Sequence, residues 1–267
     1  MPTDTSPASP RPAIVVTGAS SGIGREIARV AAKEGDALVL VGRSRSSLDA
    51  LVAELGGAGA VCTALCLDLQ KPEACRAVAQ ELEQRGLYCD VLVNSAGYGV
   101  FGPAAVHDAQ DQLGVLDVNA RALTELSLRF LPGMMVRKRG GILNVGSMTG
   151  FVAGPNMAVY YATKAYVHSL SNALAMEAVG SGVTVTCLTP GVVRTEFFER
   201  CDVGTTRISK LYPRMDADVV AKAGWRAFRQ GRRMIIPGGA NKVIAALLRL
   251  TPEVVTLNVL RVLQSRP

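Results

Sequence analysis

Several residue types and patterns are scarce in this chain of 267 residues, and each scarcity excludes a class of protein. Two histidines, and six cysteines of which no two are spaced as C-x-x-C, leave no plausible zinc ligand set, so we expect no metal. Aromatic residues make up only 5% of the chain, and basic residues form no dense run beyond 226–233, so we expect no nucleic acid. No apolar run reaches the roughly 18 residues of a membrane span.

The first twelve residues contain four prolines and no apolar core, which is not the pattern of a signal peptide. Residues 1–12 are therefore predicted to form a disordered N-terminal tail. Scattered cysteines without an export signal indicate a reducing compartment, and we expect a cytoplasmic protein. A hydrophobic content of 49% against 19% charged residues predicts a folded chain, and the length fits one large domain.

Positive charge is concentrated in the C-terminal third. Residues 194–267 hold 14 Lys and Arg against 6 Asp and Glu, a net charge of +8, whereas residues 1–193 hold 15 against 16. Such a basic region suits an anionic substrate, a membrane surface or nucleic acid, and the low aromatic content disfavours the last.

Apolar, β-branched runs alternate with amphipathic stretches along most of the chain. The runs predicted to be strands are 13–17, 37–41, 60–67, 90–94, 141–145, 183–188 and 234–237. The clearest helical stretches are 22–33, 46–55, 72–85 and 158–179. This alternation predicts an α/β domain over residues 13–240: a doubly wound Rossmann fold whose seven-stranded parallel sheet has helices on both faces. Ligands of such sheets bind beyond the carboxyl ends of the strands.

Two segments fall outside this regular pattern. Residues 195–215 lack periodicity and are predicted to be a mobile substrate loop. Residues 241–267 form a helical extension that packs on the domain, a partner subunit or a membrane surface. The apolar face of its last helix, 252–264, is wider than one docking surface needs, which favours a subunit interface or a lid over the substrate pocket. Shallow membrane insertion, helped by the basic residues, and plain core packing are the alternatives.

A glycine-rich turn, Thr17 to Gly24, follows the first strand and opens the first helix. Its glycines suit a tight turn and the close approach of a diphosphate to the helix N-terminus. The second strand ends in Val41-Gly42-Arg43-Ser44, without the acidic residue that usually holds the ribose of NAD. Arg43 suits a 2′-phosphate, so NADP(H) is the predicted cofactor, with NAD(H) as the alternative. Arg43 could equally be a solvated surface charge.

Tyr160 and Lys164 stand four residues apart on a predicted helix and so share one face. A nearby ammonium lowers the pKa of a phenol, which suits proton transfer near neutral pH. Ser147 follows the fifth strand, and Asn119 lies on a helix after the Asn94–Gly97 turn, so all four groups are predicted to converge at one sheet edge. Their plainer interpretations are a helix cap for Ser147 and a helix-face amide for Asn119.

Taken together, these motifs resemble the short-chain dehydrogenases/reductases, in the single-domain branch. The resemblance runs from about residue 13 to 195 and more loosely to 237. Within the family, the sequence resembles bacterial NADP-dependent ketoreductases. Ser95 departs from the family pattern, which usually has a second Asn there. The motifs that carry the resemblance are TGxxxGIG at 17–24, Asp68-Leu69, NxAG at 94–97, Asn119, Ser147, YxxxK at 160–164, and Pro190-Gly191 with Thr195.

The resemblance implies a role for each matching residue. Tyr160 is the proton donor or acceptor, Ser147 binds the substrate oxygen, Lys164 assists Tyr160 and holds the nicotinamide ribose, and Asn119 completes the tetrad through a water. The implied cofactor contacts are Gly18, Ser20, Ser21, Gly22, Ile23, Gly24, Arg43, Asp68, Leu69, Asn94, Ala96, Gly97, Tyr160, Lys164, Pro190, Gly191, Val193 and Thr195.

The loops after the fourth, fifth and sixth strands are expected to bind the substrate. Their apolar members either line a pocket for a hydrophobic ketone or acyl group, or are ordinary core. A non-catalytic NADP(H)-binding sensor and a reductase of small aldehydes or ketones are the alternative functions, and a homodimer or homotetramer is the expected assembly. The candidate substrate residues are Tyr98, Phe101, Phe151, Met157 and Phe197.

Overall fold

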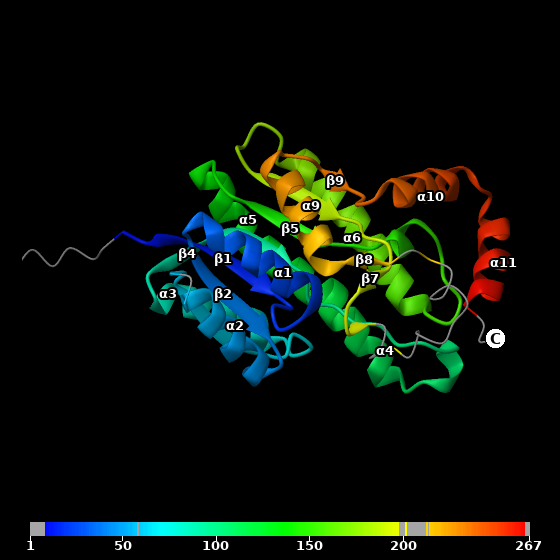
Figure 1. The fold of residues 1–267 in the computed structure, drawn as a ribbon, viewed down its shortest axis with the longest axis horizontal. Coiled ribbons are helices and arrows are strands. Elements are labelled where there is room, and N and C mark those ends of the chain that lie inside the picture. The colour runs from blue at the N-terminus through cyan, green and yellow to red at the C-terminus, as the bar shows by residue number, and fades with distance from the viewer. Residues whose placement is uncertain (1–8, 58, 198–200, 202–211, 213, 265–267) are drawn as a thin grey trace, which may run out of the picture.

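The protein is built around one twisted parallel sheet (Figure 1). The computed structural model describes residues 9–57, 59–197, 201, 212 and 214–264. In these residues seven strands pair in the order β3-β2-β1-β4-β5-β6-β9, and every pairing is parallel. The expected doubly wound, seven-stranded sheet is confirmed. The strands are β1 (Arg11–Thr17), β2 (Ala37–Gly42), β3 (Cys62–Cys66), β4 (Leu87–Asn94), β5 (Gly141–Val145), β6 (Thr184–Leu188) and β9 (Met234–Ile235).

Helices cover both faces of the sheet. One face carries α1 (Gly22–Ala31), α2 (Arg45–Gly57) and α9 (Ala217–Arg229), and the other carries α3 (Glu73–Gln84), α5 (Leu123–Arg137) and α6 (Ala158–Glu177). Strand order reverses between β1 and β4, so the crossover connections diverge there and leave a crevice at the carboxyl edge. The chemistry is expected at this edge.

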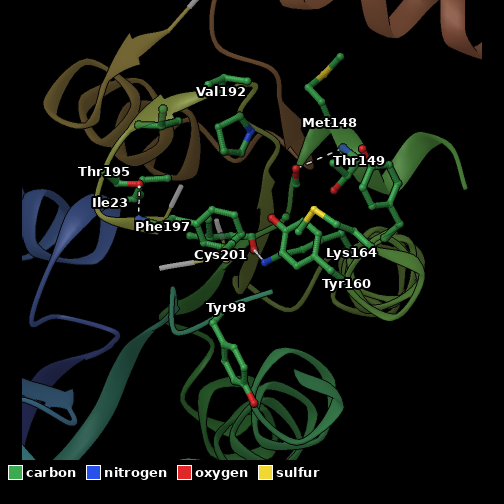
Figure 2. A pocket seen from close by; sticks show the side chains of 18 of the residues that line it. Ile23, Tyr98, Met148, Thr149, Tyr160, Lys164, Val192, Thr195, Phe197 and Cys201 are labelled. Carbon is green, nitrogen blue, oxygen red and sulfur yellow. Dashed lines mark hydrogen bonds between the residues drawn. The ribbon is translucent and has the colours of Figure 1, made fainter. Parts of the chain in front are cut away.

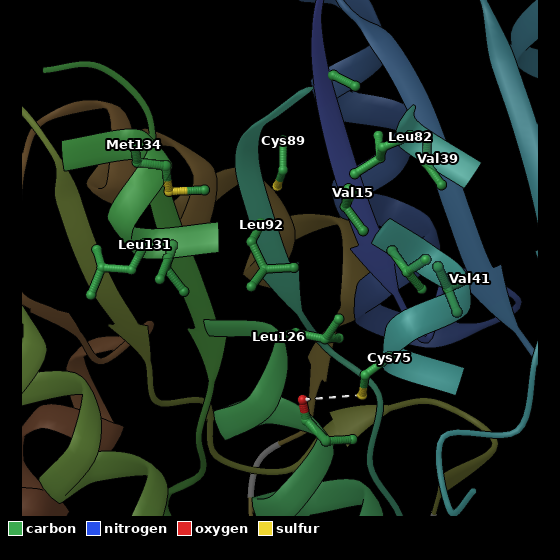
Figure 3. Close-up of a cluster of buried hydrophobic side chains, with 14 of the residues drawn as sticks. Val15, Val39, Val41, Cys75, Leu82, Cys89, Leu92, Leu126, Leu131 and Met134 are labelled. Atoms are coloured by element: carbon green, nitrogen blue, oxygen red, sulfur yellow. Dashed lines mark hydrogen bonds between the residues drawn. The ribbon is translucent and has the colours of Figure 1, made fainter. Parts of the chain in front are cut away.

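The two faces of the sheet bury separate cores because successive strand residues point to opposite sides. Val15 and Leu92 pack against α3 and α5, in the cluster shown in Figure 3. Ile14 and Val16 face the other way and pack against α1 and α9. All four side chains are fully buried, which anchors the strand ends that carry the site.

Some element boundaries differ from the sequence-based prediction. β1 begins two residues early, because the Arg11 amide donates to the Gly86 carbonyl at 2.9 Å and Pro12 lies opposite Tyr88. Residues 11 and 12, expected in the tail, therefore belong to the sheet, and residues 1–8 lie outside the described part. β9 has only two residues; as an edge strand it stops before Pro237, which has no amide hydrogen to donate.

The last two helices, α10 (Gly239–Leu250) and α11 (Glu253–Leu263), extend past the carboxyl edge of the sheet instead of covering a face (Figure 1). The expected substrate loop 195–215 falls mostly outside the described residues. Its two flanks, β7 (Val193–Arg194) and β8 (Met215–Asp216), pair with each other in parallel. Among the described residues, no helix combines the length and apolarity needed to cross a membrane.

Candidate active site

A cavity of about 990 Å³ lies at the carboxyl edge of the sheet. It begins at the turn between β1 and α1, passes the ends of β4, β5 and β6, and reaches α10 and α11. One continuous cavity thus connects the glycine-rich turn with the C-terminal helices.

The glycine-rich turn fits closely against the end of β4. The Thr17 hydroxyl accepts hydrogen bonds from the backbone amides of Ser95 and Ala96 at 3.0 and 3.1 Å, which connects the ends of β1 and β4. Gly18 has a φ of +68°, and a Cβ there would lie 2.8 Å from the Cα of Ala96, so only glycine fits. No side chain of the described residues caps the N-terminus of α1 at Ser21. Because helix N-terminal amides attract anions, this open cradle fits the diphosphate of a dinucleotide.

Arg43 and Ser44 line the same cavity at the end of β2. The Arg43 guanidinium lies 5.9 Å from the centre of the Tyr98 ring. Tyr98, a predicted substrate residue, lines the cavity and packs against the apolar cluster that contains Met157 and Tyr160. Its hydroxyl points away from Tyr160, as Figure 2 shows, and accepts a hydrogen bond from the Gln70 side chain at 3.1 Å. Tyr98 therefore lies between Arg43 and the apolar cluster around Tyr160. Asp68, another predicted cofactor contact, also lines the cavity, and its carboxylate accepts a hydrogen bond from the backbone amide of Gln70 at 3.1 Å.

Helix α6 places Tyr160 and Lys164 on the cavity wall (Figure 2). Ser147, which follows β5, lines the same cavity beside the Tyr160 hydroxyl. The Lys164 ammonium lies 5.7 Å from the centre of the Tyr160 ring and donates to the Val145 carbonyl at 2.9 Å. The three side chains are each no more than 9% exposed. The convergence expected from the sequence is thus present for these three groups.

Burial dominates the electrostatics of this cluster. It raises the pKa of the Tyr160 phenol above its ordinary value, and the Ser147 hydroxyl is the largest influence in the opposite direction. Burial also lowers the pKa of Lys164 to about 8, which leaves the ammonium about ten times more abundant than the amine at pH 7. The sequence predicts that Lys164 lowers the pKa of Tyr160. In this structure the Ser147 hydroxyl, not Lys164, is the main group that opposes the rise in the Tyr160 pKa, while the Lys164 ammonium donates to the Val145 carbonyl of β5.

Asn119 is fully hydrogen-bonded within a π-helical turn, Asp117–Ala122. Its amide accepts from the Tyr98 nitrogen at 3.0 Å and donates to the Tyr98 carbonyl at 2.9 Å and to the Thr163 hydroxyl at 3.1 Å. A Cβ on Gly97 would lie 3.0 Å from the Asn119 oxygen and 3.5 Å from Lys164 Nζ, so the two side chains flank the same backbone turn. Asn119 does not line the cavity; it braces the turn after β4 against α6.

The remaining predicted cofactor contacts divide between cavity wall and interior. Asn94 does not line the cavity, because its buried amide donates to Asn144 at 2.9 Å and to Ser127 at 3.1 Å. A Cβ on Gly22 would lie 3.1 Å from the Thr195 methyl group, so Thr195 closes over the glycine-rich turn. The predicted contacts that do line the cavity are Gly18, Ser20, Ser21, Gly22, Ile23, Gly24, Arg43, Asp68, Leu69, Ala96, Gly97, Tyr160, Lys164, Pro190, Gly191, Val193 and Thr195.

Three of the predicted substrate residues, Phe101, Met157 and Phe197, form apolar wall near Tyr160. The Phe197 ring lies 5.3 Å from the Tyr160 ring. Phe151 does not line the cavity: its ring packs on His168 at 4.7 Å, with the Arg249 guanidinium above it at 4.7 Å. Phe151 thus contacts α10 through Arg249.

Sequence reasoning missed much of the distal wall. The width of the apolar face on the last helix was the available signal, and it favoured a lid among the alternatives. Tyr161, which has no lysine four residues later, was not a candidate because only its neighbour matched the motif. Two further lining residues, Cys201 and Tyr212, lie in the predicted substrate loop 195–215. The lining residues at this end that sequence reasoning did not name are Val152, Tyr161, Ile244, Leu248, Thr251, Val255, Thr256, Val259, Leu260, Leu263 and Gln264.

A glycine-rich anion cradle leading to a buried Ser-Tyr-Lys cluster defines a dinucleotide-dependent oxidoreductase. Comparison with known proteins identifies which kind. The chain belongs to the short-chain dehydrogenase family, whose model matches residues 12–203. It is an NAD(P)-dependent enzyme that acts on CH–OH and C=O groups.

Individual relatives agree with this assignment. The chain is 40% identical over 183 residues to a galactitol 2-dehydrogenase (L-tagatose-forming) of Cereibacter sphaeroides, covering 68% of this chain and 71% of that protein. A short-chain dehydrogenase from Sphingobium yanoikuyae in complex with NADPH is 33% identical, with a TM-score of 0.79 over 88% of this chain and 92% of its own. A bulky-bulky ketone specific alcohol dehydrogenase from Comamonas testosteroni is 28% identical, with a TM-score of 0.74 over 90% and 93% of the two chains.

Proposed function

We propose that the protein is an NADP(H)-dependent oxidoreductase that interconverts a hydrophobic ketone, or another acyl-type carbonyl compound, and the corresponding secondary alcohol. The observation that carries the proposal is the position of Ser147, Tyr160 and Lys164 in one wall of the cavity, between the glycine-rich cradle and the apolar helices α10 and α11. Hydride and proton donors would therefore meet the carbonyl in an enclosed apolar space.

The protein's own groups supply the proton. NADP(H), when bound, provides the hydride at its nicotinamide ring. The raised pKa of Tyr160 keeps its phenol protonated at neutral pH, so it is ready to donate a proton to the carbonyl oxygen during reduction. The Ser147 hydroxyl, beside that phenol, donates a hydrogen bond to the same oxygen and stabilises the charge that develops there.

Lys164 and Asn119 complete the proposed tetrad from behind Tyr160. The Lys164 ammonium lies 5.7 Å from the centre of the phenol ring, and its proposed role, as the family resemblance implies, is to hold the nicotinamide ribose when NADP(H) is bound. Asn119 holds the turn after β4 with both the oxygen and the nitrogen of its side-chain amide, and that turn lies directly beside Lys164. Its proposed contribution is thus to hold the geometry in which Lys164 works.

Preference for NADP(H) over NAD(H) rests on the end of β2. Arg43 and Ser44 line the cavity there, and no carboxylate occupies the position that would repel a 2′-phosphate. An Arg–phosphate pair forms strong charge-assisted hydrogen bonds. The NADPH-bound Sphingobium yanoikuyae structure, at 33% identity, supports the same assignment.

A bulky substrate suits the distal wall better than a small aldehyde. Leu248, Val259 and Leu260 present aliphatic groups from α10 and α11, in a cavity of about 990 Å³. Measuring NADPH oxidation with bulky hydrophobic ketones and with small aldehydes and ketones tests the proposal. Turnover of the bulky set is expected. NADPH binding without turnover of any carbonyl would instead favour the non-catalytic sensor.

Two exposed surfaces support association beyond the cavity. Leu116, Leu128 and Tyr166 border an apolar groove between α5, α6 and α4 (Ala109–Leu116), and each is at least 40% exposed, which supports a homo-oligomer. Leu250 and Val254 are 83% and 70% exposed on the outer side of α10 and α11, which supports peripheral membrane contact.

A further inference from the structure

A buried amide near the end of the described chain lacks part of its hydrogen bonding. Gln264 follows α11 and is only 2% exposed. Its amide nitrogen donates to the hydroxyl of Tyr161, whereas its amide oxygen is buried and has no hydrogen-bond partner among the described residues. An unsatisfied buried polar group destabilises a fold, so such a group calls for a functional explanation.

Gln264 and Tyr161 belong to the cavity wall and not to the interior of the protein. Tyr161 follows the proposed proton donor, Tyr160, and the two rings meet edge to face with centres 6.2 Å apart. The nearest lining residues from α11 are Leu260 and Leu263, both apolar. The amide is therefore a polar group beside apolar wall residues, directly after α11, which Figure 1 shows well separated from the start of α1.

We propose that Gln264, held in place by Tyr161, is a subsite for a hydroxyl group of the substrate, remote from the carbonyl that reacts. The inference rests on the proposed function and narrows its substrate class to bulky hydroxyketones. A hydroxyl is the matching group because it can donate to a free amide oxygen and, were the amide turned over, accept from a free amide nitrogen. A substrate without that hydroxyl leaves the amide unpaired, and a site built to bind a hydroxyl discriminates strongly against such an analogue.

The Tyr161–Gln264 hydrogen bond also fixes the end of α11 against α6, so loss of Gln264 will affect the helix as well as the subsite. A purely structural role predicts an equal loss for every substrate. A subsite predicts a loss confined to substrates that carry the hydroxyl. The informative quantity is therefore the ratio of kcat/KM between two ketones of the same skeleton.

The test uses three series of 2-alkanones of six to twelve carbons, with a terminal hydroxyl, a terminal methoxy group or no substituent. NADPH oxidation gives kcat/KM for each ketone. In the wild-type protein the hydroxyl form is expected to exceed the unsubstituted form by about tenfold at the chain length that reaches Gln264. The methoxy form should show no such gain, because its oxygen has no hydrogen to donate to the amide oxygen. The advantage should fall at shorter lengths.

The variant Gln264→Leu keeps the side-chain volume and removes the amide, so it should bring the hydroxyl-to-unsubstituted ratio close to one. Gln264→Met serves the same purpose if the first variant does not fold. Asn258→Leu is the matched control, since it removes an exposed amide from the same helix, and it should keep the wild-type ratio.

The outcomes separate the two proposals. No hydroxyl advantage at any chain length in the wild type overturns the subsite, even where every ketone is reduced, and so does an advantage that persists in both Gln264 variants. Absence of reduction both of these series and of the bulky ketones named under the proposed function rejects the proposed function itself.

Discussion

Replacing Lys164 with methionine tests whether the amine beside Tyr160 carries a charge that the apo fold disfavours. Burial lowers the pKa of Lys164 from 10.5 to about 8. Between these values the unfolded chain binds more protons than the folded one, so this group's contribution to stability rises as pH rises from about 8 to 10.5. Below pH 8 both states are protonated and the buried charge costs its full amount.

The size of the effect follows from the same two values. At 1.36 kcal/mol for each pH unit, the buried charge lowers the free energy of unfolding by about 3 kcal/mol at pH 7. By pH 9.5 the folded state has lost the proton and the penalty falls by about 2 kcal/mol. Lys164→Met has no such dependence, because its side chain is neutral at every pH.

Urea unfolding of the cofactor-free wild type and Lys164→Met at pH 7 and pH 9.5, at equal protein concentration, measures this contribution. The free energy of unfolding of the wild type, relative to that of the variant, should increase by about 2 kcal/mol between pH 7 and pH 9.5. Ketone reduction by the variant should be abolished. Lys33→Met removes an exposed lysine and should show no such change. A difference independent of pH would refute the burial argument.

Three further predictions concern the proton donor, the cofactor and the C-terminal helices. Tyr160→Phe should lower kcat at least about 100-fold, because no proton donor remains, while NADPH binding measured by fluorescence titration is retained; comparable turnover would contradict the assignment. Arg43→Asp should shift the NADPH-to-NADH ratio of kcat/KM by about 1–3 kcal/mol toward NADH, and an unchanged ratio would show that Arg43 does not contact the phosphate. Full-length protein should co-sediment with anionic liposomes more than a chain lacking residues 239–267, and equal pelleting would exclude membrane contact through those helices.

The fold was predictable because its signals are local. Ile14, Val16, Leu38 and Leu40 belong to short β-branched or aliphatic runs that are buried on both faces, and such runs separated by helices have one common architecture. The start of β1 was harder to predict. Pro12 suggested a tail, yet at the end of a strand its missing amide costs little.

The candidate site was predictable only where spacing carries information. Tyr160 and Lys164 face the same way because a helix dictates it. Phe151 and Phe197 have the same hydrophobic character, yet one packs on His168 and the other on Tyr160, and only the tertiary fold separates them. The bond between Tyr161 and Gln264 joins residues 103 positions apart, which no local pattern encodes.

Lys164 and Gln264 show how this cavity differs from an ordinary core. Each is more than nine-tenths buried, and each has a polar atom whose burial disfavours the apo fold. Apolar side chains of similar size at both positions would relieve that cost, as they do at Leu260 and Leu263 in the same wall. The two polar groups lie on different elements, α6 and the end of α11, and they share the cavity as their surroundings. We expect a ligand that presents a hydroxyl or charged group to each of them to offset this cost.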